Sequence, residues 1–470
     1  MTTCGYDFRN RLETADGEID FFEKYFYDNQ DRLTKTERRD TTSAGTLLAQ
    51  SETKYDDLGR VFQSLQYSVT SGSAGNSLKE KIWYSPTGQV IKRVPMGTQA
   101  FQKMQYDGVG RVTKSFVCFD PNELDTNYSA ADDVEYDTVL RQIENTYDAA
   151  SNLIQVTTRN RFHDATLTGE LTSPGGAQPK ARVSYLAFYP DALGRMVEVA
   201  DYGTNGASSF SRSDTKPAGS DLILVSQTAY NTRGEAFQFT DPKGIVTLRG
   251  FDDAGRVFQK VEDRYGVVRT TDFTHTADSQ LATLTAVNGV TGNQTTTWTY
   301  GTTLSDSDVA SNDLLRFEQY PDGSSSDRVE YKYNRLGEVK EIKAQNGTVR
   351  SLKYDKLGRL EHDCADTLGS NVDGAVRRLT RSYEARGLLE KLTSYDNATP
   401  GSGSVVNEVK YEYNGFMLLT KESQSHQGAV TSSTPAVQYG YTDGSNNHAR
   451  RITCTSPDGT VLEYDYGYPN

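Results

Sequence analysis

The sequence has few of the residues from which metal sites and disulfide frameworks are built. Its 470 residues include only five histidines and four cysteines. The cysteines are Cys4, Cys118, Cys364 and Cys454, and no two are closer than 90 residues. The absence of a Cys-x-x-Cys pair argues against the common zinc motifs and a dense disulfide scaffold. We therefore predict no metal and no cofactor.

Long apolar runs are also absent. The densest one, Leu222–Val225, is far shorter than the roughly 20 residues that a membrane-spanning helix needs. Residues 1–20 lack both the basic and the apolar region of a signal peptide. Because some exported proteins carry no cleaved signal, this second absence leaves the location open.

Positive charge is in deficit. Lys and Arg number 50 and Asp and Glu 63, which gives a net charge of −13. Such a field repels phosphate, so nucleic acid is not expected as the main partner. The hydrophobic fraction is only 35%, yet there are 29 tyrosines against 18 phenylalanines. The chain is polar and acidic, and it favours an amphipathic ring over leucine.

One string of residues recurs along the chain. It consists of an aromatic residue, then Asp, Asn or Glu, two variable residues, Gly, Arg or Glu, and an aliphatic residue. Its turn glycines are 21 or 22 residues apart in places and 29 in others, which indicates loop insertion into one repeating unit. Degraded copies begin at Tyr27, Tyr84, Tyr147, Tyr383 and Tyr413, and a copy with one inserted residue begins at Tyr189.

We single out the turn residues of the repeat as the candidate structural site. No catalytic, cofactor-binding or metal-binding residues are predicted. The repeat turn residues are Tyr55, Asp56, Gly59, Arg60, Tyr106, Asp107, Gly110, Arg111, Tyr230, Gly234, Phe251, Asp252, Gly255, Arg256, Tyr333, Gly337, Tyr354, Asp355, Gly358 and Arg359.

The physical chemistry of the string predicts a tight β-hairpin. Asp at the first turn position accepts a backbone N–H, and Gly at the fourth adopts the left-handed conformation, which gives a type I turn with a G1 bulge. The flanks alternate with period two, so that Val329, Tyr331 and Tyr333 share one face of a strand. No segment shows a 3.6-residue period with caps. We therefore predict an all-β chain with almost no helix.

The recurring Tyr-Asp string resembles the RHS/YD-repeat family from about Tyr27 to Tyr466. The resemblance implies a YD-repeat β-hairpin array that spirals into a hollow β-shell or tube, as in Tc toxins, polymorphic toxins and teneurin-like YD barrels. In the toxins the shell encloses a toxic C-terminal domain, and teneurins are adhesion receptors. We expect one continuous array over residues 1–470, about 15 units of ~21–30 residues, drawn from a longer chain.

Other candidate chemistry has weaker support. On a strand, His362 and Cys364 face one way and Asp363 the other, which argues against a nucleophilic site. Residues 241–245 resemble a DPxGL-like string near which RHS toxin shells cleave themselves. Because this string lies in mid-chain and a further repeat follows it, we interpret it as an ordinary turn.

Three further features of the sequence concern the surface of the protein. Asp-rich turns are interpreted as solvated, and Ca²⁺ binding stays open. Glycosylation also stays open at four Asn-x-Ser/Thr strings, at Asn127, Asn293, Asn346 and Asn397. Four repeated arginines are predicted to pair with neighbouring carboxylates across strands, namely Arg60, Arg111, Arg256 and Arg359.

These observations predict a structural, non-enzymatic shell segment of an exported or cell-surface protein, part of a toxin-encapsulating cocoon. The alternative is a repeat unit of an extracellular fibre or adhesion module that binds glycan or protein. Expected partners are further repeats or neighbouring subunits, joined through uncapped edge strands. About 30 strands spaced by about 4.8 Å give roughly 140–150 Å of sheet, which wrapped once would make a tube about 45 Å across. We therefore expect either part of a longer shell or a narrower spiral tube. Cargo, ligand and parent length stay open.

Overall fold

The computed structural model describes residues 3–16, 21–120, 123, 130–264, 266–321 and 327–466. Within these ranges the chain forms 33 β-strands and a short 3-10 helix, η2 (Asn205–Ala207), and no α-helix. The all-β prediction is confirmed. No helix in the described ranges has the length and apolar character to cross a membrane. The Asn127 string lies outside the described residues.

Each strand pairs antiparallel with the next one along the chain, so the 33 strands form one continuous meander. The strands are β1 Thr3–Tyr6, β2 Leu12–Asp16, β3 Phe21–Tyr27, β4 Leu33–Asp40, β5 Leu47–Tyr55, β6 Val61–Thr70, β7 Ser73–Tyr84, β8 Val90–Val94, β9 Phe101–Tyr106, β10 Val112–Phe119, β11 Thr138–Tyr147, β12 Leu153–Arg161, β13 Ala181–Pro190, β14 Met196–Gly203, β15 Leu224–Tyr230, β16 Ala236–Thr240, β17 Val246–Phe251, β18 Val257–Arg264, β19 Val267–His275, β20 Leu281–Val287, β21 Gln294–Thr302, β22 Ser311–Gln319, β23 Arg328–Tyr333, β24 Val339–Lys343, β25 Val349–Tyr354, β26 Leu360–Thr367, β27 Arg378–Tyr383, β28 Leu389–Tyr395, β29 Val405–Tyr413, β30 Leu419–Ser425, β31 Ala436–Tyr441, β32 Arg451–Thr455 and β33 Val461–Glu463.

The turns alternate along the meander. Nearly every odd-numbered strand from β3 to β31 leads into a tight turn of the recurring string, whereas the even-numbered strands lead into turns or loops of varied length. All the tight turns therefore lie along one edge of the sheet, which we call the YD edge, and the other turns lie along the far edge. At a typical tight turn the Gly59 N–H donates to Asp56 O at 2.9 Å, and the register shifts by one residue before Tyr55.

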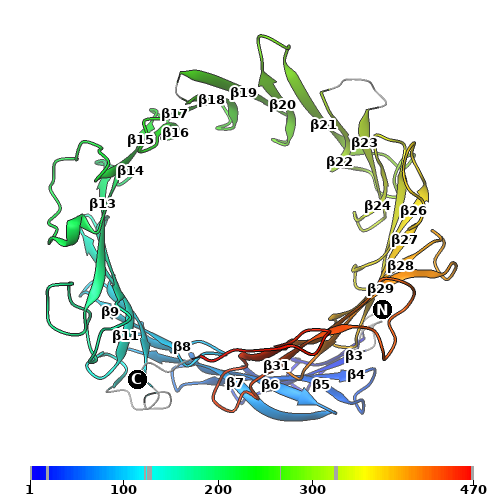
Figure 1. Ribbon diagram of the computed structural model, residues 1–470, viewed down its shortest axis with the longest axis horizontal. Helices are drawn as coiled ribbons and strands as arrows, with labels where there is room; N and C mark the ends of the chain where they lie inside the picture. Colours follow the sequence, from blue (N-terminus) through cyan, green and yellow to red (C-terminus); the bar gives the residue numbers. More distant parts are fainter. Residues whose placement is uncertain are drawn as a thin grey trace.

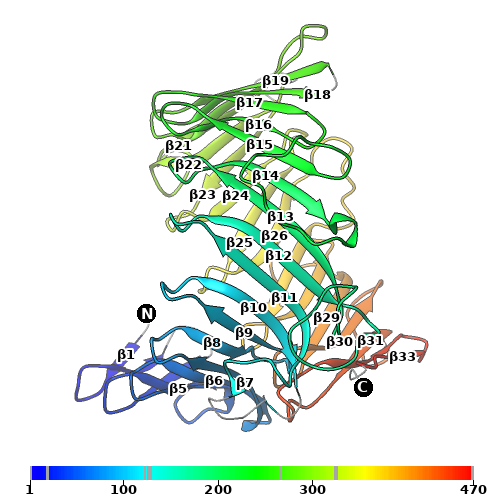
Figure 2. The same cartoon turned by 90° about the vertical axis from the view of Figure 1, so that its left-hand side faces the viewer.

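The sheet curls around an open centre (Figure 1). In the side view the first strands, β1–β7, and the last strands, β29–β33, lie at the same side of the ring but are displaced along its axis (Figure 2). The strip is therefore a screw rather than a closed ring, because its first and last strands do not pair with each other.

Consecutive turns of the screw meet at a seam, which we define as the contacts between the far edge of β4–β9 and the YD edge of β27–β32. The Val69 N–H donates to Gly415 O at 3.1 Å, and Asn447 Nδ2 donates to Thr98 O at 3.1 Å. The Asn447 Oδ1 also accepts the backbone N–H of Lys79. These contacts join the β6 end to the β29–β30 turn, and they join both the β8–β9 loop and β7 to the β31–β32 loop.

The seam has a constant period. The Val69–Gly415 and Asn447–Thr98 contacts each join positions 23 strands apart, and the β4–β5 loop shares a cavity with the β27–β28 turn at the same spacing. One turn of the screw is therefore 23 strands, about 110 Å measured across the strands. The 33 strands make about 1.4 turns. One turn therefore uses less than the whole width of the sheet, as in the narrower spiral tube that the sequence left open, and the last strands overlap the first.

The two faces of the sheet differ. Residues opposite each other in a ladder share a face, and the insertion at residues 162–180 covers the face that carries Gln142 and Tyr185. This insertion lies outside the ring (Figure 1), so that face is the outer one. Tyr147, at an odd spacing from Gln142 on β11, faces inward.

Fully buried apolar side chains gather where insertions cover the outer face. One cluster lies beneath the loops that follow β10 and β12, and a smaller one lies beneath the loop that follows β14. Elsewhere in the described ranges the sheet is mainly a single layer of half-buried side chains, with isolated buried ones such as Leu65 and Cys364, and this suits tyrosine better than leucine. The first cluster contains Val94, Phe101, Phe116, Cys118, Val134, Val139, Leu171 and Ala181.

Candidate functional site

The recurring turn is held by one carboxylate that makes three hydrogen bonds. In the β25–β26 turn, Asp355 Oδ1 accepts the backbone N–H of Leu357 at 2.8 Å and of Arg359 at 3.0 Å. The other oxygen, Oδ2, accepts Nε of Arg359 at 2.7 Å. One side chain thus fixes the turn backbone and the arginine together, which explains the spacing of Asp, Gly and Arg in the string.

The arginine then reaches the neighbouring hairpin. Arg359 Cζ lies 4.0 Å from the ring centroid of Tyr383, and the hydroxyl of Tyr383 donates to Leu360 O at 3.1 Å. The cation–π contact reaches from the arginine of one hairpin to the tyrosine of the next. The hydroxyl of that tyrosine in turn donates a hydrogen bond back to the first hairpin. Each Tyr-Asp-Arg set therefore stabilises its own turn and also joins it to the next one.

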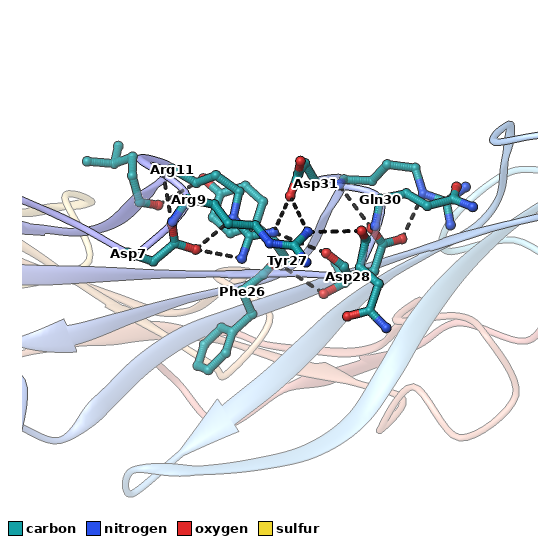
Figure 3. Close-up of polar contacts among 12 residues, drawn as sticks. Asp7, Arg9, Arg11, Phe26, Tyr27, Asp28, Gln30 and Asp31 are labelled. Carbon is teal, nitrogen blue, oxygen red and sulfur yellow. Dashed lines mark hydrogen bonds and ion pairs between the residues drawn. The ribbon is translucent and has the colours of Figure 1, made fainter.

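The first turns show the same ladder (Figure 3). Arg11 Nε donates to Asp7 Oδ2 at 2.6 Å, and its guanidinium lies 4.8 Å from the ring centroid of Tyr27. Nη1 of Arg11 continues to Asp28 O at 3.1 Å and to Asp31 Oδ1 at 2.7 Å. The ladder thus extends beyond the twenty residues singled out from the sequence.

All twenty of those residues lie at the YD edge. Their glycines have φ between +74° and +89°, where only glycine is unstrained. Phe251 has no hydroxyl and so lacks the bond to the preceding hairpin. Ten repeat tyrosines make that bond to a backbone carbonyl at 2.6–3.1 Å, namely Tyr27, Tyr55, Tyr84, Tyr106, Tyr147, Tyr230, Tyr333, Tyr354, Tyr383 and Tyr413.

The repeated arginines do not pair as predicted. Arg60, Arg111, Arg256 and Arg359 each pair with the Asp of their own turn, four residues earlier, rather than with a carboxylate across a strand pair. The turn folds the chain back so that positions four apart meet. Sequence reasoning missed this pairing, although the fixed Asp-to-Arg spacing carried the signal.

In two turns the second residue of the string is the hydrogen-bond donor and the sixth residue is the acceptor, the reverse of the Asp–Arg pair. Asn334 Nδ2 donates to Glu338 Oε2 at 2.6 Å, and Asn231 pairs with Glu235 in the same way. Where the sixth residue is Glu instead of Arg, the second residue is thus an amide donor instead of a carboxylate. The alternation of Arg and Glu in the string therefore follows from hydrogen-bond complementarity.

The copy that begins near Tyr189 has no inserted residue. Pro190 occupies the tyrosine position, and Asp191 pairs with Arg195 with the usual spacing. The side chain of Tyr189 is buried on the outer face instead, beside Ala187 and Ala200. The expectation of an insertion was wrong because it aligned the copy on its tyrosine rather than on its Asp and Gly.

The turn carboxylates are held in their charged form. The hydrogen bond from Arg256 lowers the pKa of Asp252, and that from Arg195 lowers the pKa of Asp191. For Asp355, burial raises the pKa, but the backbone N–H and guanidinium of Arg359 outweigh this and keep the pKa below its usual value. The ladder is therefore charged down to acidic pH.

A second cluster of charges is buried on the outer face, where it fastens the loop after β10. Lys92 Nζ donates to Glu123 O and Oε1, both at 2.8 Å, and Lys103 Nζ lies 2.7 Å from Asp137 Oδ2. Lys103 and Asp137 are only 2% and 1% exposed. Burial, reinforced by the hydrogen bond with Glu123, raises the pKa of Asp137 to about 7.

This cluster has the composition of an internal salt bridge. The carboxylates of Asp120, Glu123 and Asp137 lie within 4.8 Å of one another, a grouping that can hold a cation. However, the two lysine ammonium groups already contact Glu123 and Asp137. Their positive charges oppose binding of a further cation, so we assign the cluster a role in packing.

The sequence His362-Asp363-Cys364 does not form a nucleophilic site. His362 Nδ1 lies 3.1 Å from Thr380 Oγ1, whereas Asp363 pairs with Arg350 on the opposite face. Cys364 is 1% exposed, and burial raises the pKa of its thiol. The DPxGL-like string forms the β16–β17 turn, where Asp241 Oδ1 accepts two backbone N–H groups at 2.8 Å.

No family model and no curated protein matches the chain. Among solved structures, similar ones include TcdB2–TccC3 without its hypervariable C-terminal region, at TM-score 0.43 and 12% identity, over 96% of this chain and 24% of that chain. A Photorhabdus luminescens Tc holotoxin pore matches at TM-score 0.42 and 13% identity, over 96% of this chain and 22% of that chain. TcdB2–TccC3–Cdc42 matches at TM-score 0.40 and 12% identity, over 96% of this chain and 24% of that chain. The chain spans about a quarter of the length of these chains. TM-scores this low carry no functional argument.

Proposed function

We propose that this chain is a structural, non-enzymatic shell segment of the RHS/YD-repeat type, part of a cocoon that encloses a toxin domain in an exported or cell-surface protein. The observation that carries the proposal is the screw itself. A continuous 33-strand meander that turns every 23 strands makes a wall around an axis. The proposal rests on this geometry and on the repeat, and not on the Tc neighbours.

The ladder supports a structural role. The recurring spacing of Tyr, Asp and Arg is accounted for by bonds within and between hairpins, which leaves these side chains committed to the fold. The catalytic grouping that the sequence offered, around His362, is split between two faces. Extended walls of this kind lend themselves to enclosure, whereas a compact enzyme concentrates its polar groups in one cleft.

Cryo-electron microscopy of the full-length protein from its own gene tests the proposal. We expect ring-shaped cross-sections whose wall repeats every 23 strands, with a non-repetitive part of the polypeptide inside. Extended filaments with an empty centre would favour the alternative fibre or adhesion role. Hydrolysis of a polysaccharide that is lost on substitution of a single carboxylate would contradict the non-enzymatic assignment.

A further inference from the structure

Two insertions of the far edge meet over the same three strands. The loop between β12 and β13, residues 162–180, and the loop between β14 and β15, residues 204–223, are much longer than the tight turns of the array. Both approach the outer face of β11–β13. In repeat proteins, insertions of this kind commonly build the binding face, whereas packing alone needs only short turns.

The first insertion is anchored to the sheet by hydrogen bonds. The backbone N–H of Leu171 donates to Gln142 Oε1 at 2.8 Å, and Gln142 is 1% exposed. The insertion also closes on itself, since the Thr172 N–H donates to Pro179 O at 2.8 Å and the Ala181 N–H to Thr172 O at 3.2 Å. Residues 170–174 are thus held at a fixed height above the strands.

The second insertion is anchored by aromatic packing. The ring centroid of Phe210 lies 5.0 Å from that of Tyr185 and 4.4 Å from that of Tyr202. Nearby, Arg212 donates to Phe188 O at 3.2–3.3 Å and covers the ring of Tyr189. The two loops therefore form a preorganised pair of walls, which lowers the entropic cost of binding.

A cavity of about 670 Å³ lies between the walls. A carboxylate–guanidinium pair lines it, in which Arg159 Nε donates to Glu144 Oε1 at 2.7 Å and Gln142 Nε2 donates to the same oxygen at 2.7 Å. Tyr185 and Phe162 add aromatic rings to its lining. Its remaining lining is rich in hydroxyls, namely Thr172, Ser173, Thr204, Ser208 and Ser209.

This chemistry fits a polyhydroxylated ligand. Two carboxylates, Glu144 and Glu170, and two guanidinium groups, Arg159 and Arg182, line the cavity, so its lining has no net charge that would favour a highly charged ligand such as a phosphate ester. Glu144 pairs with Arg159, and Glu170 pairs with Lys114 beside the cavity. Paired planar carboxylate and guanidinium groups can accept from and donate to neighbouring hydroxyls, and aromatic rings can pack on the C–H faces of sugars. The cavity lies within the usual size range of ligand pockets.

We propose that this cavity is a carbohydrate-binding site for one or two sugar rings of a glycan. The two insertions that line it lie outside the ring (Figure 1), so the cavity stays accessible whatever the inner face encloses. The site is independent of the proposed shell role, and neither one requires the other.

Ligand-observed NMR and calorimetry on the full chain test the site, with maltose, cellobiose, lactose and chitobiose as probes. We expect saturable binding of at least one disaccharide, weakened at least tenfold by Arg159→Gln and abolished by Ser208→Trp, which fills the cavity from its lip. The matched controls are Arg328→Gln, in an outer-face ion pair away from the cavity, and Lys216→Trp, on the same insertion but outside the cavity lining. Both controls should bind like the parent.

Three results would overturn the proposal. They are no saturable binding of any of the four disaccharides, binding that Ser208→Trp leaves unchanged, or binding that the controls reduce equally. Circular dichroism of each variant excludes unfolding as the cause of a loss. Because electron microscopy reads the shell separately, a failed sugar site and a failed shell are distinguishable.

Discussion

At the scale of single residues, the Tyr-Asp-Arg set stabilises the array, as a hydrophobic core stabilises a globular domain. Each carboxylate satisfies two turn N–H groups that would otherwise have no partner, and it orients an arginine toward the next tyrosine ring. Because the bonds are local, the array can lengthen without enlarging a core. This explains why a chain with 35% hydrophobic residues is ordered over its described length.

The complementarity of the pair can be tested with a double-mutant cycle at one turn. Arg359→Glu alone should destabilise the protein, because it places a second carboxylate beside Asp355. Adding Asp355→Asn should restore much of the loss by recreating the arrangement of Asn334 and Glu338. We expect a coupling energy of about 1 kcal/mol, measured by urea unfolding. Additive effects of the two substitutions would contradict the pairing rule.

Acid should weaken the ladder. The pKa values of the turn aspartates are lowered in the folded state, so the free energy of unfolding that they contribute is present above about pH 3.9, the ordinary Asp value. It is lost as the pH falls through the lower folded-state values. The pKa of Asp137 is raised instead, to about 7. Protonation of Asp137 therefore increases the free energy of unfolding as the pH falls from about 7 to about 3.9. Urea unfolding from pH 7 to pH 2.5 should therefore show the main loss below pH 4, and a loss centred near pH 6 would contradict this account.

At the scale of elements, the hairpin depends on one backbone conformation per tight turn. Gly110 has φ +89°, whereas Gly108 in the same turn is not in the left-handed region and would have nothing within 4 Å of an added Cβ. The two glycines look alike in the sequence and differ only in their place in the turn. The bulged turn, in which the Gly110 N–H donates to Asp107 O and the Asp107 N–H donates to Arg111 O, requires Gly110.

The glycine pair supplies a matched test. Gly110→Ala should cost about 1–2 kcal/mol, because it forces alanine into the left-handed region. Gly108→Ala should be neutral or slightly stabilising, since it restricts the unfolded chain. Thermal and urea unfolding measure both variants. Equal effects of the two substitutions would show that the turn is not the G1-bulged hairpin described above.

The buried charge cluster fastens an insertion to the sheet. Lys103→Met leaves Asp137 and Glu123 short of one counter-charge in a buried site, and we expect a loss of about 3–5 kcal/mol. Lys114→Met is the control, because Lys114 pairs with Glu170 at the surface and should cost less than about 1 kcal/mol. Urea unfolding compares the two. A cost for Lys103→Met as small as that of the control would contradict a packing role for the cluster.

At the scale of the whole molecule, the seam joins consecutive turns of the screw. Its hydrogen bonds are few, and several of them join a side chain to a backbone group. Gly415 lies so close to the backbone of Val69 that an added Cβ would approach within 2.8 Å. The curvature of the sheet brings the two edges together, and close turn-to-backbone contact then fixes the pitch.

Opening the seam is a prediction at this scale. Gly415→Val should separate the edges and raise the radius of gyration in small-angle X-ray scattering, while the far-ultraviolet circular dichroism of the strands is unchanged. Gly108→Val is the control, since Gly108 holds the same position in a turn with open space around it. An unchanged radius of gyration for Gly415→Val would show that strand curvature alone holds the ring.

The hairpin follows from local features of the sequence. The period-two strands, the Asp and Gly of the turn and the repeat of 21–29 residues follow from local backbone rules, so the all-β meander was predictable. The sequence also contained the Asp-to-Arg spacing, but only the turn geometry showed that Arg359 pairs within its own turn. The sequence does not reveal Pro190 as the residue at the tyrosine position, because Tyr189 stands directly beside it.

The period of the screw, the seam and the cavity depend on how hairpins curve relative to one another, and only the tertiary structure shows them. The 23-strand period depends on contacts such as that of Asn447 with Thr98, which joins residues about 350 positions apart in the sequence. No local pattern encodes a contact over such a separation. The cavity between residues 162–180 and 204–223 likewise arises from two loops that each look like an unstructured insertion in the sequence. Twist accumulates over many strands from small rotations, so shape and seam are properties of the assembled sheet and not of any single repeat.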